Sequence, residues 1–269
     1  MIKDITFGQY YISNSIIHKL DPRLKIVLML ILIIMLFVCQ GFVSLSIYLI
    51  FVFLILISSK VPFSLYLKNT KVIIPIIIFT AILNLFYTRT GIEYNLFWGI
   101  SIFSGGIYKA IFMSLRILLL ILVSSVLTYT TTPNEITDAL ERILTPLRFI
   151  GLGNAVHTAS MMMTIALRFI PTLIDETDKI MNAQKARGAD LETGGLIKRI
   201  KALLPILIPL LLSSVRCAYE LAEAMECRCY NGGIGRRRMK QLKLTIIDYF
   251  ALIISIMLCI VIILLNIYF

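Results

Sequence analysis

The chain has 269 residues and is strongly apolar, with 59% hydrophobic residues, a mean hydropathy of +0.91 and a net charge of +11 at pH 7. This composition excludes a water-soluble globular protein and indicates an integral membrane protein, because several uncharged runs are long enough to enter a bilayer. The basic residues lie mostly between the apolar runs, so their excess indicates membrane topology and not a nucleic-acid-binding surface.

Uncharged runs predict five membrane-spanning helices. The first run, residues 26–57, would measure about 48 Å as one helix, which is too long for a single crossing of a hydrocarbon core about 30 Å thick. Gln40 and Gly41 near its middle therefore predict a tight turn between two spans. The five predicted spans are 22–39, 42–59, 70–88, 107–128 and 245–268.

The positions of Lys and Arg orient these spans, because loops rich in both residues stay in the cytoplasm. A cytoplasmic N-terminus places 23 of the 26 basic residues on that side and leaves only Arg89, Lys109 and Arg116 elsewhere. Residues 1–20 lack the apolar core of a cleavable signal peptide. Arg116 is the sole charge deep in a predicted span, and two roles stay open: reaching the membrane surface or bonding polar groups of neighbouring spans.

A polar insert, residues 129–243, separates the fourth and fifth spans and carries 16 of the 26 basic and 11 of the 15 acidic residues. Its helix-start and helix-stop residues predict one short helix, 132–144, and two long helices, 154–187 and 196–228. The expected fold class is an all-α integral membrane protein with about five transmembrane helices and a cytoplasmic domain of two long helices and one short helix. The expected domains are 1–128, 129–243 and 244–269.

Each long helix of the insert ends in an arginine, within Ala186-Arg187-Gly188 and Cys227-Arg228-Cys229. An arginine in the last turn can simply complement the helix dipole, which is worth about 0.3–1 kcal/mol. Two such ends in one cytoplasmic block also favour a second interpretation, in which each planar guanidinium pairs with a carboxylate in a groove of a partner protein. Gly188 is expected to cap the first of these helices.

The third predicted helix of the insert contains ten consecutive apolar residues, 203–212. Ten residues are too few to cross a bilayer and too many for a solvated helix. The run is either buried against the second helix and the inner membrane face, or a platform for another membrane protein. The candidate contact residues for such a partner are Met161, Met162, Leu203, Ile206, Leu207 and Leu210.

Cysteine usage indicates a reducing environment and no metal site. The five cysteines form no CxxC pair and lie in predicted membrane or cytoplasmic segments, so reduced thiols are expected. Cys227 and Cys229 are close in sequence, but no further ligand stands near them at metal-ligand spacing.

Several motifs together resemble the transmembrane T component of energy-coupling factor (ECF) ABC importers, the EcfT/CbiQ family. They are Leu20-Asp21-Pro22-Arg23-Leu24-Lys25, Thr131-Thr132-Pro133, Leu167-Arg168-Phe169-Ile170-Pro171, Ala186-Arg187-Gly188, Glu226-Cys227-Arg228-Cys229-Tyr230 and Arg236-Arg237-Arg238. The chain departs from the family's Ala-Arg-Gly pattern in the second arginine motif, with Cys227 for alanine and Cys229 for glycine. The cap of that helix is therefore expected from Asn231-Gly232.

The resemblance implies a non-catalytic scaffold in a bacterial-type cytoplasmic membrane, which uses no cofactor. Two cytosolic ABC ATPase subunits would dock at Ala186-Arg187-Gly188 and Cys227-Arg228-Cys229. A small membrane-embedded substrate-binding S component would rest on the coupling helices and take up vitamins or other micronutrients. A dedicated cobalt or nickel importer permease of the same family is the alternative.

The residues fit two other function classes poorly. An intramembrane enzyme would need clustered carboxylates to hold a divalent metal, and the only dense acidic group is Asp175, Glu176 and Asp178. A secondary transporter would need paired ionisable groups at the middle of the membrane, where Arg116 stands alone. The chain also lacks a GxxxxGK[ST] loop for binding nucleotide phosphates.

Overall fold

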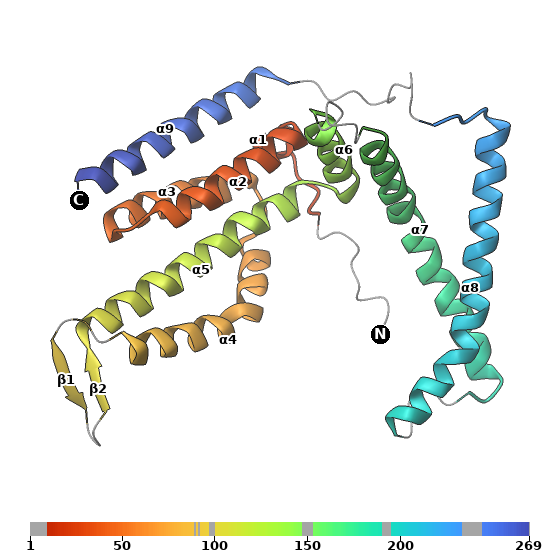
Figure 1. Ribbon diagram of the computed structural model, residues 1–269, viewed down its shortest axis with the longest axis horizontal. Helices are drawn as coiled ribbons and strands as arrows, with labels where there is room; N and C mark the ends of the chain where they lie inside the picture. Colours follow the sequence, from red (N-terminus) through yellow and green to blue (C-terminus); the bar gives the residue numbers. More distant parts are fainter. Residues whose placement is uncertain are drawn as a thin grey trace. The chain divides into compact units, whose positions relative to one another are not determined.

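The computed structural model describes residues 10–88, 90, 92–96, 100–146, 153–189, 195–232 and 244–268. These ranges contain helices and one short β-hairpin (Figure 1). In chain order the elements are α1 (Ile16–Lys19), α2 (Pro22–Val38), α3 (Phe42–Ser59), α4 (Phe63–Tyr87), β1 (Glu93–Leu96), β2 (Ile100–Phe103), α5 (Ser104–Thr130), α6 (Pro133–Leu144), α7 (Gly153–Ala186), α8 (Leu196–Cys227) and α9 (Ile246–Tyr268). The predicted all-α membrane class is confirmed, with the antiparallel β1–β2 pair as a small addition.

The chain divides into two compact units. We call residues 8–139 and 241–269 the membrane unit, and residues 140–240 the α7–α8 unit. The membrane unit contains α1 to α5, the hairpin and α9, whereas α6 crosses the boundary between the units.

The predicted spans agree with helices of the membrane unit except at the third, which was predicted to begin at residue 70. The helix α4 instead begins at Phe63 and includes Lys68 and Lys71. Counting uncharged residues missed this first part, because a lysine can lie on a helix near the membrane surface and extend its ammonium into water. Pro62, directly before α4, suits the start of a helix because it has no N–H to leave unsatisfied.

Five helices in the described part of the chain are long and apolar enough to cross a membrane: α3, α4, α5, α9 and the 203–227 portion of α8. The helix α2 has 17 residues, the lower limit of the usual range of about 17–25 for a span. The portion 203–227 corrects the expectation that the apolar run of α8 is too short to cross. The run was counted only to residue 212, but its helix continues without a break to Cys227.

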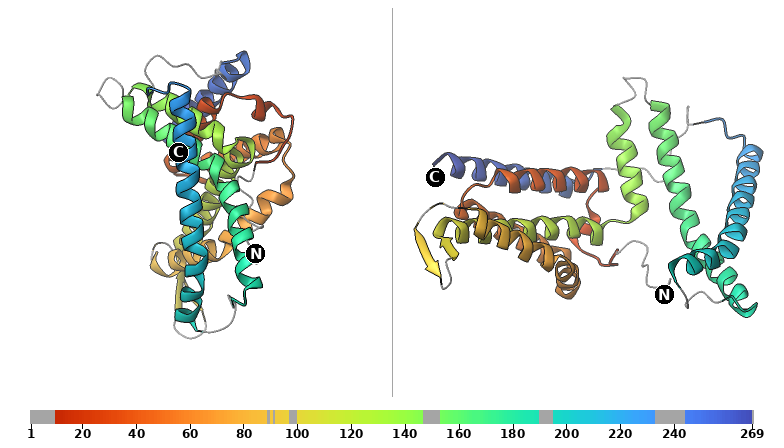
Figure 2. Two further views of the ribbon diagram at one scale, coloured as in Figure 1. Left: turned by 90° about the vertical axis from the view of Figure 1, so that its right-hand side faces the viewer. Right: turned by 60° about the horizontal axis from the view of Figure 1, so that its bottom comes forward.

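The first and last long helices of the membrane unit, α2 and α9, are parallel and joined at both ends. The buried carboxylate of Asp248 accepts a hydrogen bond from the Asp21 N–H at 2.8 Å and another from the Thr245 N–H at 2.6 Å. At the opposite end, the amide of Asn266 donates to the Val38 carbonyl. These contacts fix α9 alongside α2 over the length of both helices (Figure 2).

Two cations of the membrane unit bind the last carbonyl groups of neighbouring helices. The Lys25 ammonium donates to the Thr130 carbonyl, the last residue of α5, at 2.9 Å. The Arg116 guanidinium of α5 donates to the carbonyl of Cys39, the C-cap of α2, and lies 4.7 Å from the centre of the Phe112 ring. Of the two roles left open for Arg116, the structure supports bonding to a neighbouring helix. Both contacts also make α5 antiparallel to α2.

The core of the membrane unit lies between α2, α3, α5 and α9. Among its most completely buried apolar side chains are Leu36, Leu45, Tyr48, Leu119 and Ile262. By contrast, most apolar side chains of α4 are exposed, as expected for a helix that faces lipid. The helix α5 begins close to the end of α4, where a Cβ atom added to Gly106 would lie 2.9 Å from the Leu85 carbonyl oxygen. Only a glycine allows this approach without a shift of the backbone.

Candidate functional site

The two long helices of the α7–α8 unit form an antiparallel pair. The Gln184 amide of α7 donates to the Pro205 carbonyl of α8 at 3.3 Å. The Tyr230 hydroxyl, just after α8, donates to the sulfur of Met161 near the start of α7 at 2.9 Å. The helices run in opposite directions and cross near the end of α7 (Figure 1). Both lie within one residue of the predicted ranges 154–187 and 196–228 at each end, so these predictions are confirmed.

The end of α7 has the hydrogen bonds of a Schellman motif, in which the chain turns back through one left-handed residue. The Gly188 N–H donates to the Lys185 carbonyl and the Ala189 N–H donates to the Gln184 carbonyl, both at 3.0 Å. Gly188 has a φ of +84°, in the region that favours glycine. The predicted cap at Gly188 is therefore confirmed, and Arg187 is the last residue before the turn.

The end of α8 repeats this motif one residue after Arg228. The Cys229 N–H donates to the Glu226 carbonyl at 2.8 Å, and the Tyr230 N–H donates to the Met225 carbonyl at 3.0 Å. Cys229 takes the left-handed conformation with a φ of +53°. The expectation that Asn231-Gly232 supplies this cap is wrong. The hydrogen bonds favour the turn at Cys229 strongly enough to offset a conformational penalty of roughly 1–2 kcal/mol for a residue with a Cβ atom.

Arg187 and Arg228 thus occupy equivalent positions at the ends of their helices. Both side chains are exposed, as are their flanking residues Ala186, Gly188, Cys227 and Cys229. Neither arginine forms an ion pair with another residue in the described ranges. Because Gln184 lies beside Pro205 and Arg228 follows 23 residues later, the two helix ends are on the order of 35 Å apart. The pair can therefore present two separate guanidinium groups to carboxylates of partners in water. The basic run Arg236, Arg237 and Arg238 lies outside the described residues.

The six residues predicted to contact a membrane partner do not share one exposed face. Met162, Leu203 and Leu207 are 60%, 48% and 55% exposed. Ile206 is only 5% exposed, and Met161 and Leu210 are half-buried. The run of ten apolar residues has no periodicity of its own, so the sequence could not indicate which side of α8 packs inward.

The structure adds exposed residues that the sequence analysis missed, and together they form one surface. We call this surface the α8 apolar stripe. Its members are Leu203, Leu204, Leu207, Ile208, Leu211, Leu212, Val215 and Tyr219. On a helix with about 3.6 residues per turn these positions fall within one half of the circumference, whereas Ile206 and Leu210 fall in the other half.

A polar cluster connects α6 to the start of α7. The Glu141 carboxylate contacts the His157 Nδ1 at 3.0 Å and accepts a hydrogen bond from the Ser160 hydroxyl at 2.9 Å. The sequence analysis missed this cluster, because its members lie 16 and 19 positions apart. The carboxylate lies between the hydroxyl and the imidazole, so this is not an arrangement in which histidine activates serine. We assign the cluster a structural role.

Comparisons with known proteins agree with one another over nearly the whole chain. The family model described as "Cobalt transport protein" (CbiQ) matches residues 13–242. The energy-coupling factor transporter transmembrane protein EcfT of Clostridium kluyveri is 51% identical over 253 residues, covering 93% of each chain. The proteins with this name from Ruminiclostridium cellulolyticum and Bacillus subtilis are 49% identical over 249 residues and 40% identical over 242 residues. Each of these alignments covers at least 90% of both chains.

Proposed function

Because this chain belongs to the EcfT/CbiQ family of energy-coupling factor transmembrane components, we propose that it transmits the movement of two cytosolic ATPases to a substrate-binding membrane subunit. The observation that carries this proposal is the equivalence of the two helix ends. Arg187 and Arg228 are both exposed, both stand directly before a Schellman turn, and lie at opposite ends of one antiparallel helix pair. Two identical partners can bind two equivalent sites that are far apart.

Each arginine is proposed to bind one ATPase through a carboxylate in a groove of that subunit. The Schellman turns hold the last helical turn rigid, so each guanidinium is presented with little loss of backbone freedom on binding. The alternative, that both arginines only complement helix dipoles, accounts for about 0.3–1 kcal/mol per helix. This alternative does not explain why an arginine stands directly before a left-handed turn at both helix ends. At the second end the turn is kept although Cys229 replaces glycine.

The α8 apolar stripe is proposed to bind the substrate-binding subunit. Its side chains remain 46–73% exposed, and a continuous apolar surface of this kind is unfavourable in water. Of the six predicted contact residues, Leu203, Leu207 and Met162 remain available for this contact. Ile206 is proposed to support the stripe from the buried side of α8.

The directions of the membrane helices support a topology in which α8 does not cross the bilayer. The helices α2 and α9 are parallel and α5 is antiparallel to both. The chain therefore leaves α5 and enters α9 on the same side, so the segment between them crosses an even number of times. In the described part of that segment only the 203–227 portion is long and apolar enough to cross. A single crossing would be inconsistent with parallel α2 and α9.

The orientation follows from charge, because this shared side carries most of the Lys and Arg and is proposed to be cytoplasmic. Single cysteines placed in a cysteine-free chain at Thr90 and Asn182 should react with a membrane-impermeant maleimide from opposite sides, Thr90 from outside. Reaction of both from outside would overturn the five-span topology.

Removing the arginines tests the coupling proposal. Truncating a charged residue in a desolvated pocket typically costs about 2–5 kcal/mol, because the carboxylate of the partner is left unpaired. The affinity of the Arg187→Ala variant for the ATPases should therefore fall by about thirtyfold to several-thousandfold. The double variant Arg187→Ala with Arg228→Ala should release both ATPases and abolish uptake while still inserting into membranes. Co-purification of the ATPases and substrate uptake are the measurements.

The matched control is Arg216→Ala, which removes an exposed arginine from the middle of α8. This variant should keep both ATPases. Equal losses in Arg216→Ala and Arg187→Ala would mean that general positive charge, and not the helix ends, holds the partners. Unchanged transport in the double variant would contradict the coupling proposal and support the alternative in which both arginines only complement helix dipoles.

A second candidate function is a dedicated cobalt importer, which the description of the matching family favours. The two candidates differ in the subunits that accompany the chain. Several small membrane proteins co-purifying with one pair of ATPases would support a shared module for vitamins or other micronutrients. A single fixed membrane partner and uptake of radioactive cobalt would support the dedicated importer.

A further inference from the structure

The membrane unit contains a cavity of about 410 Å³ that neither proposed partner uses. It is bounded by α2, α3, α5 and α9 and reaches α1 at one end. This volume lies within the range of about 300–1,000 Å³ that is typical of small-molecule sites. The lining is apolar except for four residues: Lys25, Ser58, Thr130 and Ser255.

The cavity extends into only one half of the bilayer. Its lining residues cover positions 25–32 of α2, 51–58 of α3, 123–130 of α5 and 247–255 of α9. At about 1.5 Å of rise per residue these segments are each roughly 10–12 Å long, less than half of a hydrocarbon core about 30 Å thick. All four segments lie on the same side of the membrane unit, where α2 starts and α5 ends. The cavity therefore has the depth of one lipid leaflet.

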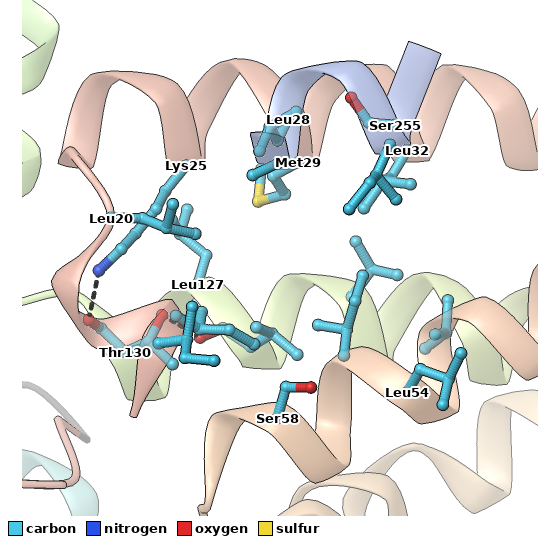
Figure 3. Close-up of a pocket in the computed structure, with 18 of the residues that line it drawn as sticks. Leu20, Lys25, Leu28, Met29, Leu32, Leu54, Ser58, Leu127, Thr130 and Ser255 are labelled. Carbon is cyan, nitrogen blue, oxygen red and sulfur yellow. Dashed lines mark hydrogen bonds between the residues drawn. The ribbon is translucent and has the colours of Figure 1, made fainter. Parts of the chain in front are cut away.

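A buried lysine closes the polar end of the cavity. Lys25 is 6% exposed and is the one charged residue among the described residues that line the cavity. In Figure 3 its side chain extends toward the end of α5, where the ammonium donates to the Thr130 carbonyl at 2.9 Å. A second hydrogen bond reaches the His18 carbonyl at 3.2 Å. An ammonium has three N–H donors, so one further acceptor can be bound.

The carboxylates around Lys25 are bound to other groups. Asp21 pairs with Arg23 at 2.8 Å, and Asp248 accepts hydrogen bonds from the backbone of Asp21 and Thr245. Glu135 accepts from the Thr132 N–H at the start of α6. Within the described ranges no carboxylate forms an ion pair with Lys25. All three carboxylates still attract the Lys25 ammonium through space, but none of them takes up its third N–H donor, which is left for an acceptor from outside the chain.

The rim of the cavity is open toward the surface of the membrane unit. Ile16, Leu54 and Phe250 line it and are 63%, 56% and 62% exposed. Figure 3 places Leu28, Met29 and Leu32 on one side of the space and Leu54, Ser58 and Leu127 on the opposite side. An acyl chain that enters between these walls has apolar contacts on both sides. The surrounding bilayer supplies such chains at high concentration.

We propose that this cavity is a phospholipid site. One acyl chain occupies the apolar walls, and the phosphate group of the lipid accepts a hydrogen bond from Lys25. The leaflet is the cytoplasmic one on the proposed orientation, but the site itself does not depend on the coupling function.

Filling the cavity gives the first test. The full chain is reconstituted in nanodiscs of phosphatidylglycerol and phosphatidylethanolamine and extracted into mild detergent, and native mass spectrometry counts the retained phospholipids. The Ser58→Phe variant places a large side chain in the cavity and should lower retention about tenfold, since most of the buried contact area is lost. The matched variant Ser46→Phe changes an exposed serine of the same helix outside the cavity and should retain lipid like the parent chain.

Removing the charge gives the second test. Lys25→Met should lower retention about tenfold by loss of a charge-assisted hydrogen bond, whereas Lys19→Met, which changes an exposed lysine outside the cavity, should not. Should Lys25→Met fail to fold, the Ser58→Phe and Ser46→Phe pair decides alone. Equal retention in Ser58→Phe and the parent chain, or an equal loss in Ser46→Phe, would overturn the proposal.

Discussion

The two units of the molecule use their polar side chains in opposite ways. In the membrane unit, charged and amide groups bind backbone groups of other helices: Lys25, Arg116, Asp248 and Asn266. In the α7–α8 unit, the arginines at both helix ends are exposed and the α8 apolar stripe faces outward. The membrane unit therefore uses these groups mainly to join its own helices, whereas the α7–α8 unit presents polar and apolar groups that external partners can bind.

This difference predicts that substitutions in the two units fail in different ways. Changes to the membrane unit should lower stability, because its polar groups have buried partners that would be left unsatisfied. Changes to the exposed groups of the α7–α8 unit should leave stability nearly intact and affect partner binding.

The largest loss of stability is expected from Asp248→Leu. The substitution leaves the buried Asp21 N–H without its acceptor, which costs about 1–3 kcal/mol. It also removes the capping contacts of the exposed Thr245 at the start of α9, worth about 0.5–2 kcal/mol. The free energy of unfolding in detergent should therefore fall by roughly 2–5 kcal/mol. Asp248→Asn, which keeps an acceptor oxygen, should lose less. Asp175→Leu, an exposed position, serves as the control. A loss within experimental error for Asp248→Leu would contradict the role of this carboxylate.

Neighbouring positions of α8 should separate packing from partner binding. Ile206 is buried and Leu207 is 55% exposed, so glutamate has opposite consequences at the two sites. Ile206→Glu should destabilise the helix pair by about 3 kcal/mol, because it buries a charge without a partner. Leu207→Glu should change stability by less than about 0.5 kcal/mol and release the substrate-binding subunit.

Both residues were predicted from the sequence to contact a partner, and comparing them separates a packing role from a contact role. Thermal unfolding and co-purification with the substrate-binding subunit are the two measurements. If Leu207→Glu fully retains that subunit, the stripe is not part of the interface. If both variants lose the same stability, the burial of Ile206 and the exposure of Leu207 are contradicted.

The smallest effects are expected at the two helix turns, and they should have opposite signs. Gly188 and Cys229 hold the same left-handed position. Gly188→Ala should destabilise the end of α7 by about 1 kcal/mol, whereas Cys229→Gly should stabilise the end of α8 by a similar amount. No atom lies within 4 Å of a Cβ added at Gly188, so backbone conformation is the sole cause there. Amide hydrogen exchange of the last helical turns measures both, and equal signs would refute the shared geometry.

The sequence predicted some features well because local residues determine them. The ends of α7 and α8 agree to one residue, since Gly188 and the terminal arginines mark helix ends. The start of α4 was predicted seven residues late, because the criterion of low charge ended the span before Lys68, although a helix can include a lysine.

Other features depend on contacts that no local pattern encodes. The packed face of α8 is set by α7, since ten apolar residues in a row favour every face equally. The turn at Cys229 could not be predicted from residue preference, which favours glycine there. The contact of Arg116 with the Cys39 carbonyl joins residues 77 positions apart, so the sequence alone left its role open.

The pairing of α2 with α9 has a consequence for how the protein is made. Asp21 is synthesised 227 residues before the carboxylate that its N–H binds. Four membrane helices and the whole α7–α8 unit therefore leave the ribosome before the last helix can dock. At about 5–20 residues per second, the interval is on the order of 10–45 s. During that time the α9-facing side of α2 has to be covered by lipid or by a membrane chaperone, and the membrane unit is completed only when α9 arrives.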